Sequence, residues 1–114
     1  MVENIPQEQT AKIAKLNDAF RKDPTQGFIM LSQGMRANRL VDIDAIMEMF
    51  RTYNDFNANN DPYGEHDFGA FTFKGQKIFW KIDYFDKDLT GLSPDASNAK
   101  ITTRVATIMY AEEY

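Results

Sequence analysis

The sequence predicts an α+β fold in which a small antiparallel sheet packs against two helices. Two segments in the first half repeat apolar residues at helical spacing, and one segment in the second half alternates apolar with polar residues. The chain has 114 residues, 43% of them hydrophobic, and no cysteine. A chain of this length buries enough surface to form one core without disulfides, so we expect residues 1–114 to form a single domain.

The first expected element is a helix from Gln7 to Arg21. Ile13, Leu16 and Phe20 recur at the spacing of one helical face. Pro24 follows the last of these residues closely, and proline cannot continue a helix. The segment therefore predicts a helix with one buried stripe.

A short strand and a second helix come next. The apolar run Phe28-Ile29-Met30-Leu31 predicts a strand, and residues 35–38 are compatible with a helical turn. The second helix is expected from about Asp42 to Tyr53, because apolar residues recur there on one helical face. These residues are Ile43, Ile46, Met47, Phe50 and Tyr53. Asp42 or Asn38 is suited to cap the start of this helix.

The clearest expected element is a β-hairpin with strands Phe68 to Phe73 and Lys77 to Phe85. Gly75 supplies the positive φ that a two-residue hairpin turn needs. A loop of residues 75–76 pairs Phe73 with Ile78, whereas a loop of residues 74–75 shifts the pairing by two. Both registers place the same residues on the core face, namely Phe71, Phe73, Ile78, Trp80, Ile82 and Tyr84.

The last part of the chain is expected to be a loop from Asp86 to Lys100 and then a strand from Ile101 to Tyr110. The loop is rich in Gly, Pro, Ser, Asn and Asp, and the strand is rich in β-branched residues. The predicted sheet therefore consists of the hairpin, this C-terminal strand and the short N-terminal strand.

Composition excludes several classes of site and location. A chain without cysteine has no disulfide and no thiolate zinc site, and the single histidine excludes a multi-histidine metal site. The net charge of −4 argues against direct nucleic-acid binding, which needs clustered Lys and Arg. No apolar run approaches the roughly 20 residues that cross a bilayer, and the N-terminus lacks a signal-peptide pattern. We therefore expect a cytoplasmic protein without membrane contact.

The candidate functional residues gather where the hairpin begins and ends. Glu65, His66 and Asp67 follow a polar turn, and strand pairing brings Asp83 near them, with Asp86 close behind. His66, Asp67 and Asp83 are candidate catalytic residues for acid/base chemistry. Asp83 and Asp86 are candidate ligands of a divalent metal, although the sequence requires no cofactor. The structural alternative is that Asp and Asn side chains organise the turn while His66 bonds the backbone.

Arg104 lies within a β-branched strand, where an arginine must reach either solvent or a carboxylate. With Glu65 it is a candidate for binding a phosphate or carboxylate ligand. The alternative is a structural ion pair with Asp83 or Glu65. Trp80 and its aromatic neighbours are expected in the core rather than as a platform that stacks on bases.

Three segments resemble a family of small bacterial proteins with a domain of unknown function. The segments read NNDPYGEHDFG at residues 59–69, FWKIDYFD at residues 79–86 and TRVATIMYAEEY at residues 103–114. The resemblance implies that the three segments form one structural unit. The family that they resemble occurs mostly in alphaproteobacteria and is often encoded on plasmids or other mobile elements. It implies no activity. The family often has Tyr where this chain has Phe85, and Leu where it has Ala106.

Three hypotheses about function follow. In the first, the chain is a non-enzymatic accessory protein of a mobile element that binds or inhibits a host, phage or plasmid protein. In the second, it is a metal-dependent or acid/base hydrolase that uses Glu65, His66 and Asp67 with Asp83 and Asp86. In the third, the polar motif is a structural joint and the function lies on another surface.

Overall fold

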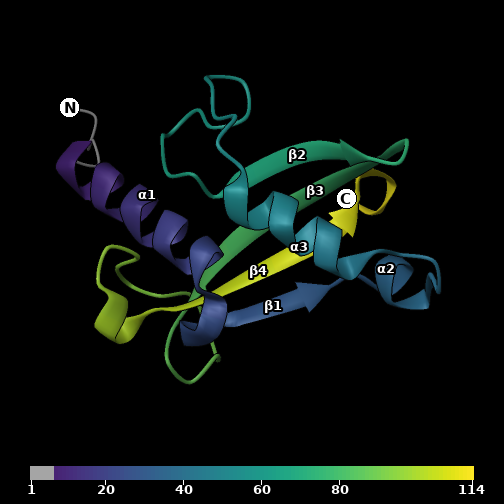
Figure 1. The fold of residues 1–114 in the computed structure, drawn as a ribbon. Helices are drawn as coiled ribbons and strands as arrows, with labels where there is room; N and C mark the ends of the chain where they lie inside the picture. Colours follow the sequence, from purple (N-terminus) through teal and green to yellow (C-terminus); the bar gives the residue numbers. More distant parts are fainter. Residues whose placement is uncertain (1–6) are drawn as a thin grey trace.

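The computed structural model describes residues 7–114, which form a four-stranded sheet with helices packed against it (Figure 1). The elements in chain order are α1 (Gln7–Lys22), η1 (Pro24–Gln26), β1 (Phe28–Leu31), α2 (Gln33–Ala37), α3 (Ile43–Thr52), β2 (Phe68–Phe73), β3 (Gln76–Phe85), η2 (Ala99–Ile101), β4 (Thr103–Tyr110) and η3 (Ala111–Glu113). The α+β class that the sequence predicts is confirmed.

The strands lie in the order β1-β4-β3-β2. β2, β3 and β4 pair antiparallel, whereas β1 pairs parallel to β4. The sheet is therefore mixed, not wholly antiparallel. The reason is topological: after β1 the chain runs through α2 and α3 to the opposite edge, and β4 then returns beside β1 in the same direction (Figure 1).

The hairpin adopts the second of its two predicted registers. Phe73 pairs with Gln76 and Phe71 pairs with Ile78, so residues 74–75 form the loop. Lys74 and Gly75 both have positive φ, at 50° and 79°. Two successive positive φ angles give a turn whose twist matches that of the flanking strands, which explains the choice of register.

The core lies between the helices and one face of the sheet. Its buried residues are Phe20, Met35, Ile46, Phe50, Ile78, Trp80, Ile82, Ala106 and Ile108. The predicted core face of β3 is thus confirmed, and Phe71, Phe73 and Tyr84 pack against it as half-buried residues. Residues at alternate positions of β3, such as Phe79 and Asp83, face the side of the sheet away from this core.

Two glycines allow close packing around this core. A Cβ atom on Gly69 would lie 2.4 Å from Nε1 of Trp80, and one on Gly27 would lie 2.3 Å from the carbonyl oxygen of Arg104. Both distances are too short for any side chain. The indole of Trp80 therefore lies directly over the backbone of β2, where only glycine fits.

Helix and strand ends depend on local side-chain hydrogen bonds. Asp42 caps α3 by accepting from the N–H of Ala45, as the sequence predicts. β4 begins at Thr103, two residues later than predicted, because residues 99–101 form a 3₁₀ turn whose start is capped by Asn98. Within residues 7–114, no helix combines the length and the apolarity needed to cross a membrane.

Candidate functional site

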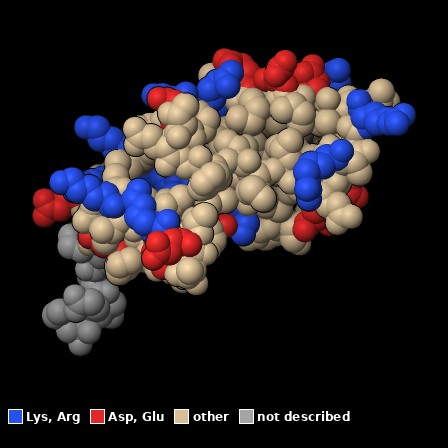
Figure 2. Space-filling model, turned by 90° about the horizontal axis from the view of Figure 1, so that it is seen from below, with Lys and Arg blue, Asp and Glu red and all other residues tan. Residues whose placement is uncertain are grey.

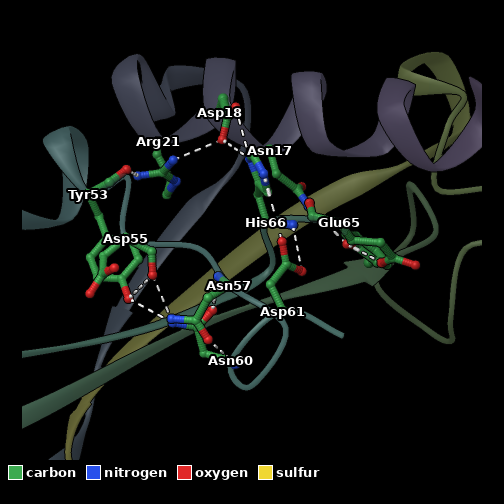
Figure 3. Close-up of polar contacts among 11 residues, drawn as sticks. Asn17, Asp18, Arg21, Tyr53, Asp55, Asn57, Asn60, Asp61, Glu65 and His66 are labelled. Carbon is green, nitrogen blue, oxygen red and sulfur yellow. Dashed lines mark hydrogen bonds and ion pairs between the residues drawn. The ribbon is translucent and has the colours of Figure 1, made fainter. Parts of the chain in front are cut away.

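A polar cluster joins α1 to the segment of residues 53–67, which connects α3 to β2 (Figure 3). Its centre is formed by Asn17 and Arg21, which are both buried although both are polar. They lie four and eight residues after Ile13, on the same buried face of α1. Sequence analysis missed both residues, and that spacing was the signal available to find them.

Arg21 is 2% exposed and fixes α1 to the end of α3. Its Nη1 donates to the carbonyl oxygens of Phe50 and Tyr53, each at 2.9 Å. Its Nη2 pairs with Asp18 at 2.8 Å, and its guanidinium lies 5.0 Å from the Trp80 ring centroid. A cation is favourable at a helix C-terminus, where backbone carbonyls lack partners, so these contacts give Arg21 a structural role. The Nε of Arg21 is buried and has no hydrogen-bond partner within the described chain.

His66 lies between two carboxylates in Figure 3. Its Nδ1 is 3.0 Å from Oδ1 of Asp18, and its Nε2 is 3.7 Å from Oδ2 of Asp61. Its ring stacks on Phe56 with 3.9 Å between the centroids. Because both ring nitrogens face carboxylates, neither is directed at open space where a substrate would meet it.

The turn before His66 is organised by its own amide and carboxylate groups. Asn57 accepts from the N–H groups of Asn59 and Asn60, and the Asn60 amide donates to the carbonyl of Asp55 (Figure 3). Asp61 accepts from the N–H of His66, whose φ is 57°. These contacts agree with the part of the structural alternative in which Asn and Asp side chains organise the turn. The His66 ring contacts carboxylates, however, and not the backbone as that alternative expected.

The other two candidate carboxylates of β3 and its loop do not join His66. Asp83 pairs with Lys81 at 3.1 Å, on the opposite face of the sheet from the core, whereas His66 contacts α1 on the core face. Asp86 accepts from the N–H and hydroxyl of Thr90 and so closes the following turn. The structure thus offers no shared cleft for His66 and Asp83.

No group of three or more His, Cys, Asp or Glu residues is arranged to hold a metal ion in the part of the chain that the structure describes. A divalent metal at Asp83 and Asp86 stays a prediction from sequence. The ion pair of Asp83 with Lys81 and the hydrogen bonds of Asp86 with Thr90 already explain the positions of the two carboxylates.

Asp67 and Glu65 lie next to His66 and give this side of α1 an excess of carboxylates. Burial raises the pKa of Asp67, and the nearby charge of Glu65 raises it further. The backbone N–H of Asp67 itself lowers this pKa in part, and no other residue among 7–114 donates to the carboxylate. The carbonyl oxygen of Asp67 accepts from the N–H of Ile82. The folded structure therefore disfavours the ionised form of the Asp67 carboxyl group.

Arg104 belongs to a second arm of the polar cluster, together with Asn17 and Tyr84. Its Nε donates to Oδ1 of Asn17 at 2.6 Å, and its Nη2 donates to the carbonyl oxygen of Ala96 at 2.7 Å. The amide of Asn17 donates to Tyr84, whose hydroxyl donates to Glu65 at 2.8 Å. Glu65 and Arg104, the two predicted ligand-binding residues, are thus connected through intermediates and form no direct ion pair.

Burial has the expected effect on this arm. It lowers the pKa of Arg104 and raises the pKa of Tyr84 well above its ordinary value, because both charged forms lose water. An arginine remains protonated even so. The arm therefore contains one buried positive charge.

Comparison with known proteins gives a family but no activity. A family model described as "Protein of unknown function (DUF3768)" matches residues 24–113, which is 90 of the 114 residues. No match was found among curated proteins or among solved structures. The matched range begins after α1, so Asn17, Asp18 and Arg21 lie outside it although they complete the polar cluster.

Proposed function

This chain belongs to the family described as "Protein of unknown function (DUF3768)", and we propose that it is a non-enzymatic module that binds a strand of another protein along β1. The observation that carries the proposal is the composition of this edge strand. Phe28-Ile29-Met30-Leu31 contains no charge and no proline. Folded proteins usually protect their edge strands with charged residues or proline, because an unprotected edge can pair with a strand of another protein.

The backbone of β1 is suited to such an addition. The N–H of Ser32 donates to the carbonyl of Ile108 in β4, so the N–H groups at alternate positions before it also point to β4. The N–H groups of Ile29 and Leu31 therefore lie on the free edge, as donors for an incoming strand. β1 is the lowest strand in Figure 1, with no strand beyond it.

The side chains of β1 indicate the chemistry of the partner. Phe28 and Met30 are 51% and 53% exposed and lie on the face of the sheet away from the core. Figure 2 shows the molecule from below, with uncharged surface across the centre and charged residues mainly around its rim, including a row of acidic residues along the upper edge. The partner segment should therefore be extended and should place apolar side chains at alternate positions against Phe28 and Met30.

A binding role agrees with the polar cluster better than catalysis does. The one histidine of the chain is held between Asp18 and Asp61, and Asp83 is paired with Lys81 on the other face. The sequence resemblance adds a narrower hypothesis. In it, the partner is a cytoplasmic host, phage or plasmid protein that this chain occupies or inhibits on behalf of a mobile element.

The test compares two charge substitutions on the two edge strands. Met30→Glu places a charge on β1, and the control Thr72→Glu places one on β2, at an exposed position of the opposite edge. Each immobilised variant is incubated with lysate of the source organism, and a stoichiometric protein is identified by mass spectrometry. We expect the wild type and Thr72→Glu to retain this protein and Met30→Glu to lose it. Equal recovery by all three proteins, or no stoichiometric protein at all, would contradict the proposal.

Hydrogen exchange with the purified partner then tests the mode of binding. Strand addition should slow exchange of the Ile29 and Leu31 amides, because these donors gain acceptors. Light scattering of the isolated chain measures whether it forms a dimer. A stable dimer that Met30→Glu dissociates would show that β1 pairs with a second copy, and it would overturn the proposal of a different protein partner.

A further inference from the structure

A hollow of about 510 Å³ lies between the C-terminal half of α1 and the loop that joins β3 to β4. This volume is typical of small-ligand sites. Figure 1 shows that loop folded beside α1, at the end of the sheet where β4 begins. Part of the wall is apolar and is formed by Leu16, Ala19 and Phe20.

The hollow is also lined by Arg104, which is 5% exposed. Its Nε and Nη2 donate to Asn17 and Ala96, but its Nη1 makes no hydrogen bond to any residue within 7–114. Neither does any carboxylate of the described chain lie within ion-pair distance of the guanidinium. The centroid of the Tyr84 ring lies 5.2 Å from the guanidinium carbon. Nη1 of Arg104 is not among the fully buried donors that lack a partner in the described chain, so it reaches open space as a donor that no described residue uses. A mostly buried guanidinium without a carboxylate beside such a space is suited to bind an anion.

Two further charges line the hollow, Lys87 and Asp23. Asp23 is engaged by the N–H and hydroxyl of Thr25. Lys87 is exposed and forms no ion pair within the described chain. The lining therefore has one net positive charge, enough for one carboxylate but weak for a doubly charged phosphate.

We propose that this hollow binds a small organic carboxylate. Its carboxylate accepts from Nη1 of Arg104 with Lys87 nearby, and its apolar body packs on Leu16 and Phe20. Arginine donors suit carboxylate oxygens, and such charge-assisted bonds are the strong class of hydrogen bonds. None of the residues that line the hollow belongs to β1, so the proposal does not depend on the proposed protein partner.

The first experiment uses the unmodified protein and two probes of the same shape. Sodium benzoate carries a carboxylate on an apolar ring, and benzamide carries a neutral amide on the same ring. Each is titrated at constant ionic strength, and binding is followed by ¹⁵N NMR at the side-chain Nε–H of Arg104. We expect saturable shifts with benzoate and binding at least about tenfold weaker with benzamide, since the difference is one charge-assisted hydrogen bond.

The second experiment blocks the hollow without touching Arg104. Ala19 is exposed on α1 and lines the hollow, so Ala19→Phe fills it from the outside. The matched control is Ala11→Phe, an exposed position two turns earlier on the same helix. We expect Ala19→Phe to weaken benzoate binding at least about tenfold and Ala11→Phe to leave it within twofold. Lys87→Ala should weaken it about two- to threefold, since an exposed charge contributes little.

Several results would overturn the proposal. They are equal binding of benzoate and benzamide, no saturable shift of Arg104 with benzoate, or unchanged benzoate binding in Ala19→Phe. Inorganic phosphate is titrated in parallel, and tighter binding of phosphate than of benzoate would refute the assignment to carboxylates.

Discussion

The two buried arginines, Arg21 and Arg104, differ in how their charges are compensated, although Arg21 lies one turn after Asn17 in α1 and Arg104 bonds Asn17. Arg21 meets the carboxylate of Asp18 and two carbonyl oxygens at the end of α3. Arg104 meets an amide oxygen and one carbonyl oxygen, and it lines a hollow. They are almost equally buried, so burial does not distinguish a structural arginine from one that can bind a ligand. Charge compensation and adjacent open space distinguish them.

The same contrast applies to the carboxylates. Asp18 and Asp61 flank His66 on the side of α1 near Arg21, whereas Glu65 accepts from Tyr84 in the arm that holds Arg104. The lining of the hollow beside Arg104 has one net positive charge, from Arg104, Lys87 and Asp23. If this comparison is right, substitutions on the Arg21 side should mainly change stability, and substitutions around the hollow should mainly change binding.

The largest expected effect is that of Arg21→Met. This change leaves Asp18 and the carbonyl oxygens of Phe50 and Tyr53 without their partner, so we expect a loss of about 3–5 kcal/mol in the free energy of unfolding. Urea denaturation followed by circular dichroism measures it. The control is Arg51→Met, which removes an exposed pair with Glu48 and should cost less than about 1 kcal/mol. Similar losses in both variants would break the comparison.

A smaller loss is expected for Arg104→Met. The substitution removes two hydrogen bonds but no ion pair, and it removes a charge whose burial is unfavourable. We expect about 1–3 kcal/mol in the same denaturation experiment. Should Arg104→Met destabilise as much as Arg21→Met, Arg104 would be a structural residue like its counterpart.

Tyr84→Phe tests the link between the two sides. The Tyr84 hydroxyl accepts from Asn17 and donates to Glu65, and the variant leaves the amide of Asn17 with only the Glu65 carbonyl. We expect a loss of about 0.5–1.5 kcal/mol, measured by urea denaturation. Tyr63→Phe removes an exposed hydroxyl and should leave stability unchanged. A Tyr84→Phe variant with unchanged stability would show that the hydroxyl link between Asn17 and Glu65 does not stabilise the fold.

The smallest expected effect is the contribution of the Asp67 carboxyl group to the pH dependence of stability. Because the folded state raises the pKa of Asp67 above its ordinary value of 3.8, the folded protein binds this proton more tightly than the unfolded chain does. This contribution to stability is present at low pH and is lost as pH rises through the raised pKa. Asp67→Asn should therefore stabilise the protein slightly at pH 7 and give no gain at pH 3. Thermal unfolding across pH 3–7 checks this, and a destabilised variant at pH 7 would contradict it.

Much of the fold was predictable because local patterns dictate it. The stripe of Ile43, Ile46 and Phe50 predicts α3, and the alternation through Ile78, Trp80 and Ile82 predicts the core face of β3. The polar turn was also placed correctly, since Asn and Asp favour turns. The parallel pairing of β1 was not predictable, because it depends on where α3 carries the chain and not on the residues of β1.

The candidate site was predicted only in part. Glu65, His66 and Asp67 do belong to a polar cluster, but the positive φ of His66 sends its ring towards α1 and away from Asp83. No sequence spacing reveals that change of direction. Arg104 was recognised as unusual, but its partner Asn17 lies 87 residues away in sequence.

The sequence by itself determined the helices, the hairpin and the apolar face of the sheet, because the spacing of apolar residues along the chain decides which local structure can bury them. It also placed Asn17, Arg21 and Arg104 at positions of α1 and β4 that face the core, so their polar groups need partners in the interior. The tertiary structure alone decided which arginine received a carboxylate and which one faced a hollow. Compensation of a buried charge depends on groups that come together only when distant segments pack.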